Sequence, residues 1–566
     1  MLTAMRIVLA TLHSKYIHPS LALPYLAAYC ADLTCEIEIR EFTLHEPKEN
    51  ILAMLLAGSP DVIALSVYLW NRHETLELVD ALAVARPQLK IVLGGPEVSF
   101  EDHGLFHSHP GLTALVRGEG ELPFRGLLDA WLNDTHPRSV ARLAWRDGDQ
   151  VIEGPGESPL QDLDTIPSPF AAGLVDLKRG FTYLETSRGC PYRCSFCMSS
   201  RDQQVRSFSM TRIYRDLRLL MEAQVPKIKL VDRTFNYDAT RAREIFAYIL
   251  AHNQGSHFHF EIGAHLLDAE TLELLTRVPA DTFQFEIGVQ STLDETLDTI
   301  ERRVDMARLE QNVSTLRQNT SIHLHLDLIA GLPGENYPQL LHSLDRVIAL
   351  NPHHLQLEAV KLLPGAPLRE SADQHGILFD PHPPYTVLGT PQITFSELQS
   401  TRALSRLLDL SWNHGRMRPF LTELATHCGS FSQGLDRLAN RLETNGALRH
   451  PLAQRGLFET LALALDEEFG AEASQLKERL ARDYALSERV SPNNPPAFFD
   501  TRLTEAEKIK VRDHVALELA EIRGKGIKLQ HFACIFHTRQ ATGRRLHLYL
   551  YLTRSGTGLT VKEIPL

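Results

Sequence analysis

Two stretches of this 566-residue chain alternate short apolar segments with amphipathic ones, and that alternation restricts the possible folds more than any other feature. In the first stretch, strand-like segments cover residues 6–10, 37–42, 62–67, 91–94 and 114–116, and helix-like segments cover 21–31, 49–56, 75–85 and 123–132. Strands that alternate with helices build a parallel sheet covered on both faces. Residues 1–137 are therefore expected to form a doubly wound, Rossmann-like α/β domain.

A sheet of this kind binds ligands beyond the carboxyl ends of its strands. Glycines in the loops found there would let the backbone approach a flat ligand closely. The alternative is simple turn chemistry in a domain that binds nothing. The candidate ligand contacts in these loops are Ser66, Tyr68, Gly94, Gly95, Pro96, Glu97, Gly118 and Glu119.

The alternation resumes between residues 181 and about 379. Strand-like segments are expected at 181–186, 227–231, 258–262, 282–287, 322–329 and 354–358, and helices at 213–221, 241–249, 269–275 and 340–348. This pattern predicts a partial barrel of parallel strands, with fewer strands than the eightfold version. Residues 138–180 are predicted to be a connector, with a hairpin that turns at Asp147-Gly148.

Residues 380–566 are predicted to form a mainly helical C-terminal domain. Helix-period apolar residues occur at 398–410, 434–442, 457–469 and 473–481. Near the end, residues 546–552 are strand-like, and residues 555–558 form a predicted turn.

Three cysteines, Cys190, Cys194 and Cys197, stand within eight residues in the loop after the first barrel strand. Thiolates are the usual ligands of iron–sulfur clusters. Three of them leave one iron of a four-iron cluster without a protein ligand, so that iron can hold a substrate or cofactor. The alternatives are three reduced core thiols or a zinc site. Zinc would need a distant fourth ligand, because no histidine lies between residues 182 and 251.

The cysteine spacing, with Phe196 directly before the last cysteine, resembles the signature of the radical S-adenosylmethionine (radical SAM) superfamily. The resemblance implies that the open iron chelates the amino and carboxylate groups of S-adenosylmethionine. An electron from the [4Fe-4S] cluster then cleaves a carbon–sulfur bond to give a 5'-deoxyadenosyl radical. Cys190, Cys194 and Cys197 would be both the metal ligands and the catalytic centre.

Together with the N-terminal domain, these features resemble the cobalamin-binding radical SAM family, in the subgroup with an uncharacterised C-terminal domain. The resemblance implies that cobalamin binds in the N-terminal crevice. The Asp-x-His-x-x-Gly arrangement that ligates the metal in other cobalamin proteins is absent from this sequence, as it commonly is in the family. The resemblance is carried by the segments 23–28, 93–97, 117–121 and 166–170.

The resemblance also suggests which barrel residues contact S-adenosylmethionine. Asp232 and Arg233 would orient its amino-acid part, whereas Glu286 and Gln290 would bind the ribose and Gly331 and Gly334 would lie near the adenine. Two alternatives stay open: a surface pair between Asp232 and Arg233, and a buried salt bridge between Glu286 and a lysine or arginine of a neighbouring strand. A third open question concerns His323, His325 and Asp327, which alternate on one strand and could point into the barrel or away from it.

Composition excludes several classes of protein. The net charge of −12 gives no general basic field, so nucleic acid is an improbable partner. Seven cysteines without a disulfide-like ladder suit a reducing compartment. Neither a membrane-spanning run nor a cleavable leader is evident, so the protein is expected to be cytoplasmic, with no membrane partner.

The sequence therefore favours a radical SAM enzyme that transfers a methyl group through cobalamin to an unactivated centre of a small molecule or peptide. The family resemblance implies an external reductant such as flavodoxin or ferredoxin. One alternative keeps the cluster but changes the reaction to a rearrangement, a ring contraction or closure, or 3-amino-3-carboxypropyl transfer. The other is a metal-stabilised binding protein without catalysis.

Overall fold

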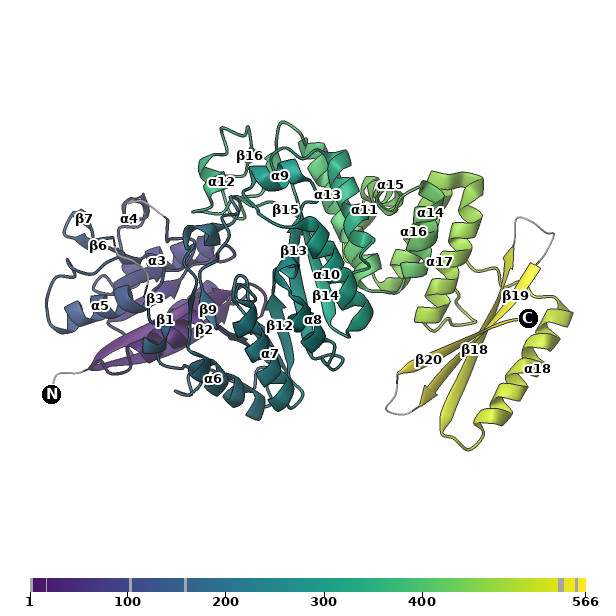
Figure 1. The fold of residues 1–566 in the computed structure, drawn as a ribbon, viewed down its shortest axis with the longest axis horizontal. Coiled ribbons are helices and arrows are strands. Elements are labelled where there is room, and N and C mark those ends of the chain that lie inside the picture. The colour runs from purple at the N-terminus through teal and green to yellow at the C-terminus, as the bar shows by residue number, and fades with distance from the viewer. Residues whose placement is uncertain (1–3, 17, 101–103, 157–159, 538–543, 555–557) are drawn as a thin grey trace. The chain divides into compact units, whose positions relative to one another are not determined.

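The structure is a computed structural model that describes residues 4–16, 18–100, 104–156, 160–537, 544–554 and 558–566 (Figure 1). The chain divides into two compact units. Unit 1 comprises Met1–His325, Gly331–Glu335 and Val360–Gln392. Unit 2 comprises Leu326–Ala330, Asn336–Ala359 and Ile393–Leu566.

The first sheet of unit 1 has the strand order β2-β1-β3-β4-β5-β6-β7. Strands β1 to β5 pair in parallel, which confirms the predicted Rossmann-like topology. The strands are β1 (Met5–His13), β2 (Cys35–Thr43), β3 (Val62–Ser66), β4 (Lys90–Gly94), β5 (Leu112–Val116), β6 (Leu143–Asp147) and β7 (Gln150–Glu153). The helices are α1 (Ala22–Tyr29), α2 (Lys48–Leu56), α3 (Arg72–Ala85), α4 (Gly104–Ser108) and α5 (Glu121–Leu132).

Both faces of this sheet carry apolar side chains, as a doubly wound sheet requires. Along β1, Val8, Ala10 and Leu12 belong to one buried cluster, whereas Ile7 and Leu9 belong to another. The predicted hairpin is present as β6 and β7. It extends the first sheet, because β6 pairs antiparallel with β5, so these strands are more than a connector.

In the second sheet, unit 1 contributes the parallel strands β13-β12-β11-β8, in that order. Their bounds are β8 (Phe181–Leu184), β11 (Lys227–Leu230), β12 (His257–Glu261) and β13 (Phe283–Gln290). The helices that follow them are α6 (Met210–Glu222), α7 (Ala239–His252), α8 (Ala269–Leu275), α9 (Asp294–Thr299) and α10 (Met306–Asn319).

One face of these strands packs against helices. The ring of Phe246 in α7 lies 5.1 Å from that of Phe260 and 5.4 Å from that of Phe283, centroid to centroid. Buried and partly buried residues alternate along β11, β12 and β13. The partly buried, mostly polar residues therefore face away from α7.

Unit 1 also contains the segment after the barrel, with α12 (Pro367–Glu370), β16 (Leu378–Phe379) and β17 (Val387–Gly389). Between β8 and β11 lie the short elements β9 (Ser187–Arg188), η2 (Met198–Arg201) and β10 (Arg206–Ser207). Strands β9 and β10 pair antiparallel, and the loop between them along the chain contains the three cysteines.

Unit 2 is mainly helical, as predicted. The strand β14 (His323–Ala330), whose first three residues belong to unit 1, neighbours β15 (His354–Ala359) in the second sheet. The helices are α11 (Tyr337–Ile348), α13 (Phe395–Leu408), α14 (Arg418–Cys428), α15 (Phe431–Thr444), α16 (Gln454–Phe469), α17 (Ala473–Ser487) and α18 (Glu505–Ile522).

The C-terminal tail is an antiparallel sheet of the strands β18 (Ile527–His537), β19 (Arg544–Arg554) and β20 (Leu559–Pro565). Only the central strand of this sheet was predicted, as residues 546–552. The predicted turn at 555–558 falls largely on 555–557, outside the described residues. Within the described part of the chain, no helix is both long and apolar enough to cross a membrane.

Candidate functional site

The cysteine loop begins at Gly189 and returns to β10. Gly189 has a φ of +88°, and a Cβ there would lie 2.4 Å from the carbonyl oxygen of Gln204, so only glycine fits. The Cys190 amide donates to the carbonyl oxygen of Asp202 at 2.9 Å, and the Cys197 amide donates to that of Cys194 at 3.0 Å. The loop is thus folded back on itself, and it presents all three thiols from one short segment.

The three thiols are free cysteines. Cys194 is buried, whereas Cys190 and Cys197 are half-buried. Burial raises the pKa of the Cys194 thiol, although the guanidinium of Arg302, 3.5 Å from its Sγ, acts in the opposite direction. The Sγ of Cys190 lies 3.6 Å from the hydroxyl of Thr234. Phe196 is half-buried in the same loop.

The donor set fits an iron–sulfur cluster better than a single metal ion. Among the described residues, no three His, Cys, Asp or Glu side chains are grouped so that they could hold one ion, which disfavours the zinc alternative. In a cluster each thiolate binds a different iron atom, so its ligands do not need to converge on one point. Three free thiols on a single loop, with an arginine beside one of them, are a suitable set.

Asp232, at the end of β11, is fully buried. Its carboxylate accepts hydrogen bonds from the Thr186 amide at 3.1 Å, the Thr186 hydroxyl at 2.5 Å and the Ser187 hydroxyl. The guanidinium of Arg241 lies 3.6 Å from it. Arg233 is exposed, whereas Asp232 is buried and directed to Thr186, Ser187 and Arg241, so the two residues do not form a surface pair. Asp232 holds the segment that leads into the cysteine loop, and its contact with S-adenosylmethionine stays a prediction.

Glu286, on the polar face of β13, is contacted by histidines. The Nε2 atom of His259 lies 2.9 Å from its carboxylate, and Nδ1 of His325 lies 4.0 Å away. The contact with His259 holds the pKa of Glu286 below its usual range, although burial opposes the shift. Within the described residues, no lysine or arginine forms an ion pair with Glu286, although the charge of Lys229 helps to lower its pKa.

Gln290 ends the same face of β13 with a φ of +73°. Its side chain lies over Gly288, where an added Cβ would come within 2.2 Å of the Gln290 amide nitrogen. Next along the chain, the Ser291 hydroxyl donates to Glu335 at 2.8 Å. Gly331 and Gly334, both with positive φ, form the turn that leads to Glu335. The predicted ribose and adenine segments therefore lie side by side.

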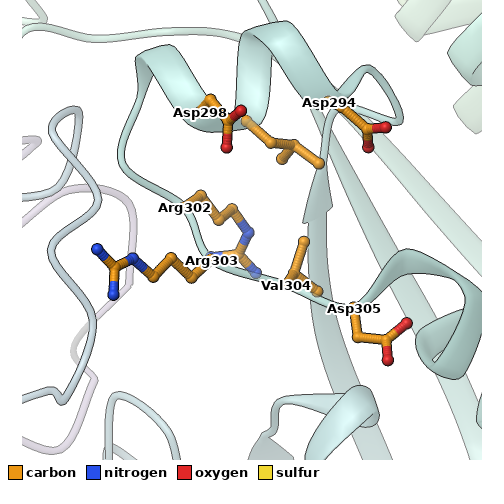
Figure 2. A pocket seen from close by; sticks show the side chains of 7 residues that line it. Asp294, Asp298, Arg302, Arg303, Val304 and Asp305 are labelled. Carbon is orange, nitrogen blue, oxygen red and sulfur yellow. The ribbon is translucent and has the colours of Figure 1, made fainter.

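Arg302 connects the cysteine loop with β13. It lies in the turn between α9 and α10, donates to the carbonyl oxygen of Gly288 and contacts Cys194. It lines a cavity of about 590 Å³. Figure 2 shows it there together with Asp294 and Asp298 of α9. The other lining residues are Leu297, Arg303, Val304 and Asp305. No sequence signal identified Arg302, because its partners lie far away along the chain.

The loop after β3 lies beside the barrel strand β8. The Tyr68 ring stacks on that of Trp70 at 4.6 Å, and the Tyr68 amide donates to Asn71 at 2.7 Å. Burial raises the pKa of the Tyr68 hydroxyl, and Tyr183 of β8 adds to the shift. Ser66, at the end of β3, is buried. These candidate cobalamin contacts therefore lie next to the barrel.

The segment from Gly94 to Glu97 follows β4. Gly95 has a φ of +108°, and a Cβ there would lie 2.6 Å from the carbonyl oxygen of Val67, so glycine is required. Gly94 and Pro96 are half-buried. The buried carboxylate of Glu97 accepts a hydrogen bond from the Tyr385 hydroxyl at 2.8 Å. Glu97 thus attaches this loop to the segment after the barrel.

Glu119 and Glu121 form ion pairs with the arginines that flank the cysteine loop. Arg206 binds Glu119 through two nitrogens, at 2.5 and 3.1 Å. Arg188 donates to Glu121 at 2.7 Å and lies 3.4 Å from Glu119. Gly118, with a φ of +69°, turns the chain ahead of these carboxylates. This segment ties the N-terminal domain to the cysteine loop, and its direct contact with cobalamin stays a prediction.

Three family models match consecutive parts of the chain. The B12 binding domain matches residues 6–128, the radical SAM superfamily matches residues 184–347, and a protein family of unknown function (DUF4080) matches residues 373–523. The expected cofactor classes, namely cobalamin, a [4Fe-4S] cluster and S-adenosylmethionine, are those of the first two domains.

The cobalamin-dependent radical SAM methyltransferase TokK of Streptomyces tokunonensis is 29% identical over 387 residues, which cover 61% of this chain and 54% of TokK. The chain thus spans about half the length of this relative. OxsB, a cobalamin-dependent S-adenosylmethionine radical enzyme solved with aqua-cobalamin, shares the fold with a TM-score of 0.61 at 17% identity, over 85% of this chain and 80% of OxsB. TsrM from Kitasatospora setae, solved with cobalamin and a [4Fe-4S] cluster, shares it with a TM-score of 0.56 at 17% identity, over 85% of this chain and 99% of TsrM. The chain thus carries a B12 binding domain, a radical SAM superfamily domain and a DUF4080 domain in this order, which is the combination that the sequence resemblance predicts.

Proposed function

We propose that this protein is a cobalamin-dependent radical SAM methyltransferase that acts on an unactivated centre of a small molecule or peptide. The observation that carries the proposal is the direct contact between the two cofactor domains within unit 1. Glu119 and Glu121 of the N-terminal domain form ion pairs with Arg188 and Arg206, which flank the cysteine loop. Such buried, multiply bonded pairs fix relative position strongly, since loss of one partner costs about 3–5 kcal/mol.

When bound, the cluster and S-adenosylmethionine supply a carbon-centred radical, and cobalamin supplies a transferable methyl group. In this proposal Cys190, Cys194 and Cys197 hold the cluster, while Arg302 donates to the buried sulfur of Cys194. Glu286 binds the ribose hydroxyls through its carboxylate, whose pKa the contact with His259 lowers. The loops at 66–71, 94–97 and 118–121 hold cobalamin at the barrel.

The proposal also includes the electron donor, the cellular compartment and the domain boundaries. A cytoplasmic reductant such as flavodoxin or ferredoxin would supply the electron, and the reducing cytoplasm would protect the thiols. Residues 1–137 would form the cobalamin domain, 181–379 the barrel and 380–566 the accessory domain. Residues 138–180 would connect the first two, with a hairpin that extends the N-terminal sheet. Methyl transfer is supported by the similarity to TokK, which is a cobalamin-dependent radical SAM methyltransferase.

The test is anaerobic reconstitution of the full chain, followed by measurement of the nucleoside products. Formation of S-adenosylhomocysteine together with 5'-deoxyadenosine is expected. 5'-Deoxyadenosine alone would indicate radical chemistry without methyl transfer, and methylthioadenosine would indicate aminocarboxypropyl transfer. The matched control for C190A/C194A/C197A is C428A, because Cys428 is a half-buried free thiol of the helical part. Retention of cleavage in the triple variant would refute the proposal.

A further inference from the structure

The strands β8, β11, β12 and β13 carry a polar face opposite the helices. The fully buried rings of Phe258, Phe260, Phe283 and Phe285 mark the helix side. The residues between them, which are only partly buried, face the interior of the partial barrel. In unit 1 these interior residues include Phe181, Tyr183, Lys227, Lys229, His257, His259, Glu261, Gln284, Glu286 and His325.

Charge is segregated along this interior face. The two acidic residues, Glu261 and Glu286, are register partners toward the carboxyl ends of the strands. The amino-terminal half instead carries Lys227 and Lys229, whose register partners on β12 are His257 and His259. On β8, Lys229 neighbours Tyr183. The interior is therefore acidic near the cysteine loop and basic at the other end.

No carboxylate of the described residues contacts the two lysines of the basic end directly, although the charge of Lys229 helps to lower the pKa of Glu286. Neither Lys227 nor Lys229 forms an ion pair with any residue in the part of the chain that the structure describes. The Lys229 ammonium instead lies 5.6 Å from the centroid of the Phe181 ring. That ring is in turn 5.5 Å from the ring of His18, which comes from the N-terminal domain. Two half-buried lysines on neighbouring positions of one strand face, one of them beside an aromatic ring, are costly unless an anion joins them.

The pKa shifts of Lys227 and His18 show that the positive charges at this end of the barrel repel one another. Burial lowers the pKa of Lys227, and the neighbouring charge of Lys229 lowers it further. Burial also lowers the pKa of His18, with His13 and Lys229 adding to the shift. A bound anion would relieve this repulsion and favour the charged form of each group.

We infer that Lys227 and Lys229 bind an acidic group of the substrate, a carboxylate or a phosphate. The inference deepens the proposed function and rests on it, because it assigns a chemical class to the methyl acceptor. Counted along the strands in register, Lys229 lies two residues and Lys227 four residues before Glu286. At the rise of a β-strand these separations are about 7 and 13 Å. The acidic group would thus be held about that far from the part of the substrate that reacts beside Glu286.

The carboxylate of S-adenosylmethionine is a less suitable occupant. It is expected at the cysteine loop, which leaves from the carboxyl end of β8. The lysines lie in the opposite half of the interior face. The rest of the substrate does not need a second basic group, because aromatic side chains such as Tyr183 can pack against its apolar part.

The experiment uses the full chain, reconstituted anaerobically with iron, sulfide and cobalamin. Equilibrium dialysis measures binding of inorganic phosphate and, separately, of succinate, so that the two arms distinguish phosphate from carboxylate. The K227M/K229M variant is expected to bind the preferred anion at least tenfold more weakly than the wild type. The conservative K229R variant should retain binding, and the control K178M, which changes an exposed lysine ahead of β8, should match the wild type.

Equal binding by the wild type and K227M/K229M, or binding of neither anion by the wild type, would overturn the inference. Circular dichroism and retention of cobalamin establish that the double variant is folded. S-Adenosylmethionine affinity and substrate-free cleavage are expected to change by less than twofold. A tenfold loss of that affinity would assign the lysines to S-adenosylmethionine and also overturn the inference. Absence of cleavage in the wild type would refute the proposed function, whereas dialysis reports on the lysines independently.

Discussion

Two glutamates, Glu286 in the barrel and Glu563 in the C-terminal sheet, have similar surroundings but different numbers of partners. Each lies on a strand, is partly buried and has a histidine 2.9 Å away. Glu563, on β20, also accepts from the Tyr549 hydroxyl at 2.9 Å and from two nitrogens of Arg482 at 3.0 and 3.1 Å. The partners of Glu286 within the described residues are His259 and, at 4.0 Å, His325.

This difference separates a structural carboxylate from a candidate binding group. A carboxylate offers about four acceptor positions, and Glu563 has filled them with donors of its own fold. Burial would raise the pKa of Glu563, but the bonds from His547, Arg482 and Tyr549 lower it to about 2. Glu286 has spare acceptor capacity on a face that looks into the barrel. A ligand hydroxyl can therefore bind Glu286 without displacing a protein donor.

The largest expected effect is on stability in unit 2. The substitution E563A leaves Arg482 and His547 without their shared acceptor, so local opening of β19 and β20 should become easier by about 3 kcal/mol. Hydrogen–deuterium exchange of peptides from these strands measures that opening. E505Q, at an exposed carboxylate of α18, is the control and should leave exchange unchanged. Normal protection of β20 in E563A would show that the Glu563 contacts add little.

Next in size is the effect of E286Q on binding. Loss of the charge should weaken S-adenosylmethionine cleavage about 100-fold, which corresponds to about 2.7 kcal/mol. Exchange of β13 should stay within about 1 kcal/mol of the wild type, because the amide keeps the side-chain volume. Cleavage assays and exchange on the same preparation check both statements. Opening of β13 with unchanged cleavage would make Glu286 a structural group like Glu563.

A smaller effect is expected from H259Q, up to about tenfold on cleavage at the acid end of the pH–rate profile and little at neutral pH. The imidazole of His259 lowers the pKa of Glu286, so its loss lets that pKa rise. Glu286 then protonates at a higher pH, and the acid limb of the pH–rate profile should move upward. H257Q is the matched control, because the ring of His257 bonds the carbonyl oxygen of Asp281 instead. An unmoved acid limb would exclude this positioning role.

The smallest expected effect is that of mild acid on the C-terminal sheet. The folded pKa of Glu563, about 2, lies below its usual value of 4.5. Its contribution to stability is therefore fully present above pH 4.5 and is lost as the pH falls toward 2. Between pH 7 and pH 4 exchange of β20 should change only slightly, and E563Q should remove this dependence. A steep loss of protection above pH 5 would implicate other groups.

Strands and helices with a regular hydrophobic period could be predicted from the sequence, whereas the tertiary contacts of their side chains could not. Every predicted strand of the two parallel sheets is present, since apolar segments of that length have few other ways to be buried. The strands β18 and β20 escaped prediction, because their mixed polar residues lie in a sheet that is only partly buried. The helices α14 and α18 were also missed.

Site residues divide in the same way. Cys190, Cys194 and Cys197 could be proposed as cluster ligands because a set of thiolate ligands is recognised by its spacing along a single loop. Arg302, Lys229 and His259 could not, because their importance depends on neighbours from other strands and turns. The partners of Glu97, Glu119 and Glu121 likewise became evident only in the fold.

The sequence alone determined the order of the domains, the parallel sheets and the three-thiol loop, because each depends on periodicity or spacing within a short segment. Tertiary structure decided which charged side chains satisfy one another and which keep acceptor or donor capacity. Hydrogen bonds and ion pairs act over only a few ångströms, and residues far apart in the sequence reach that distance only when the chain folds.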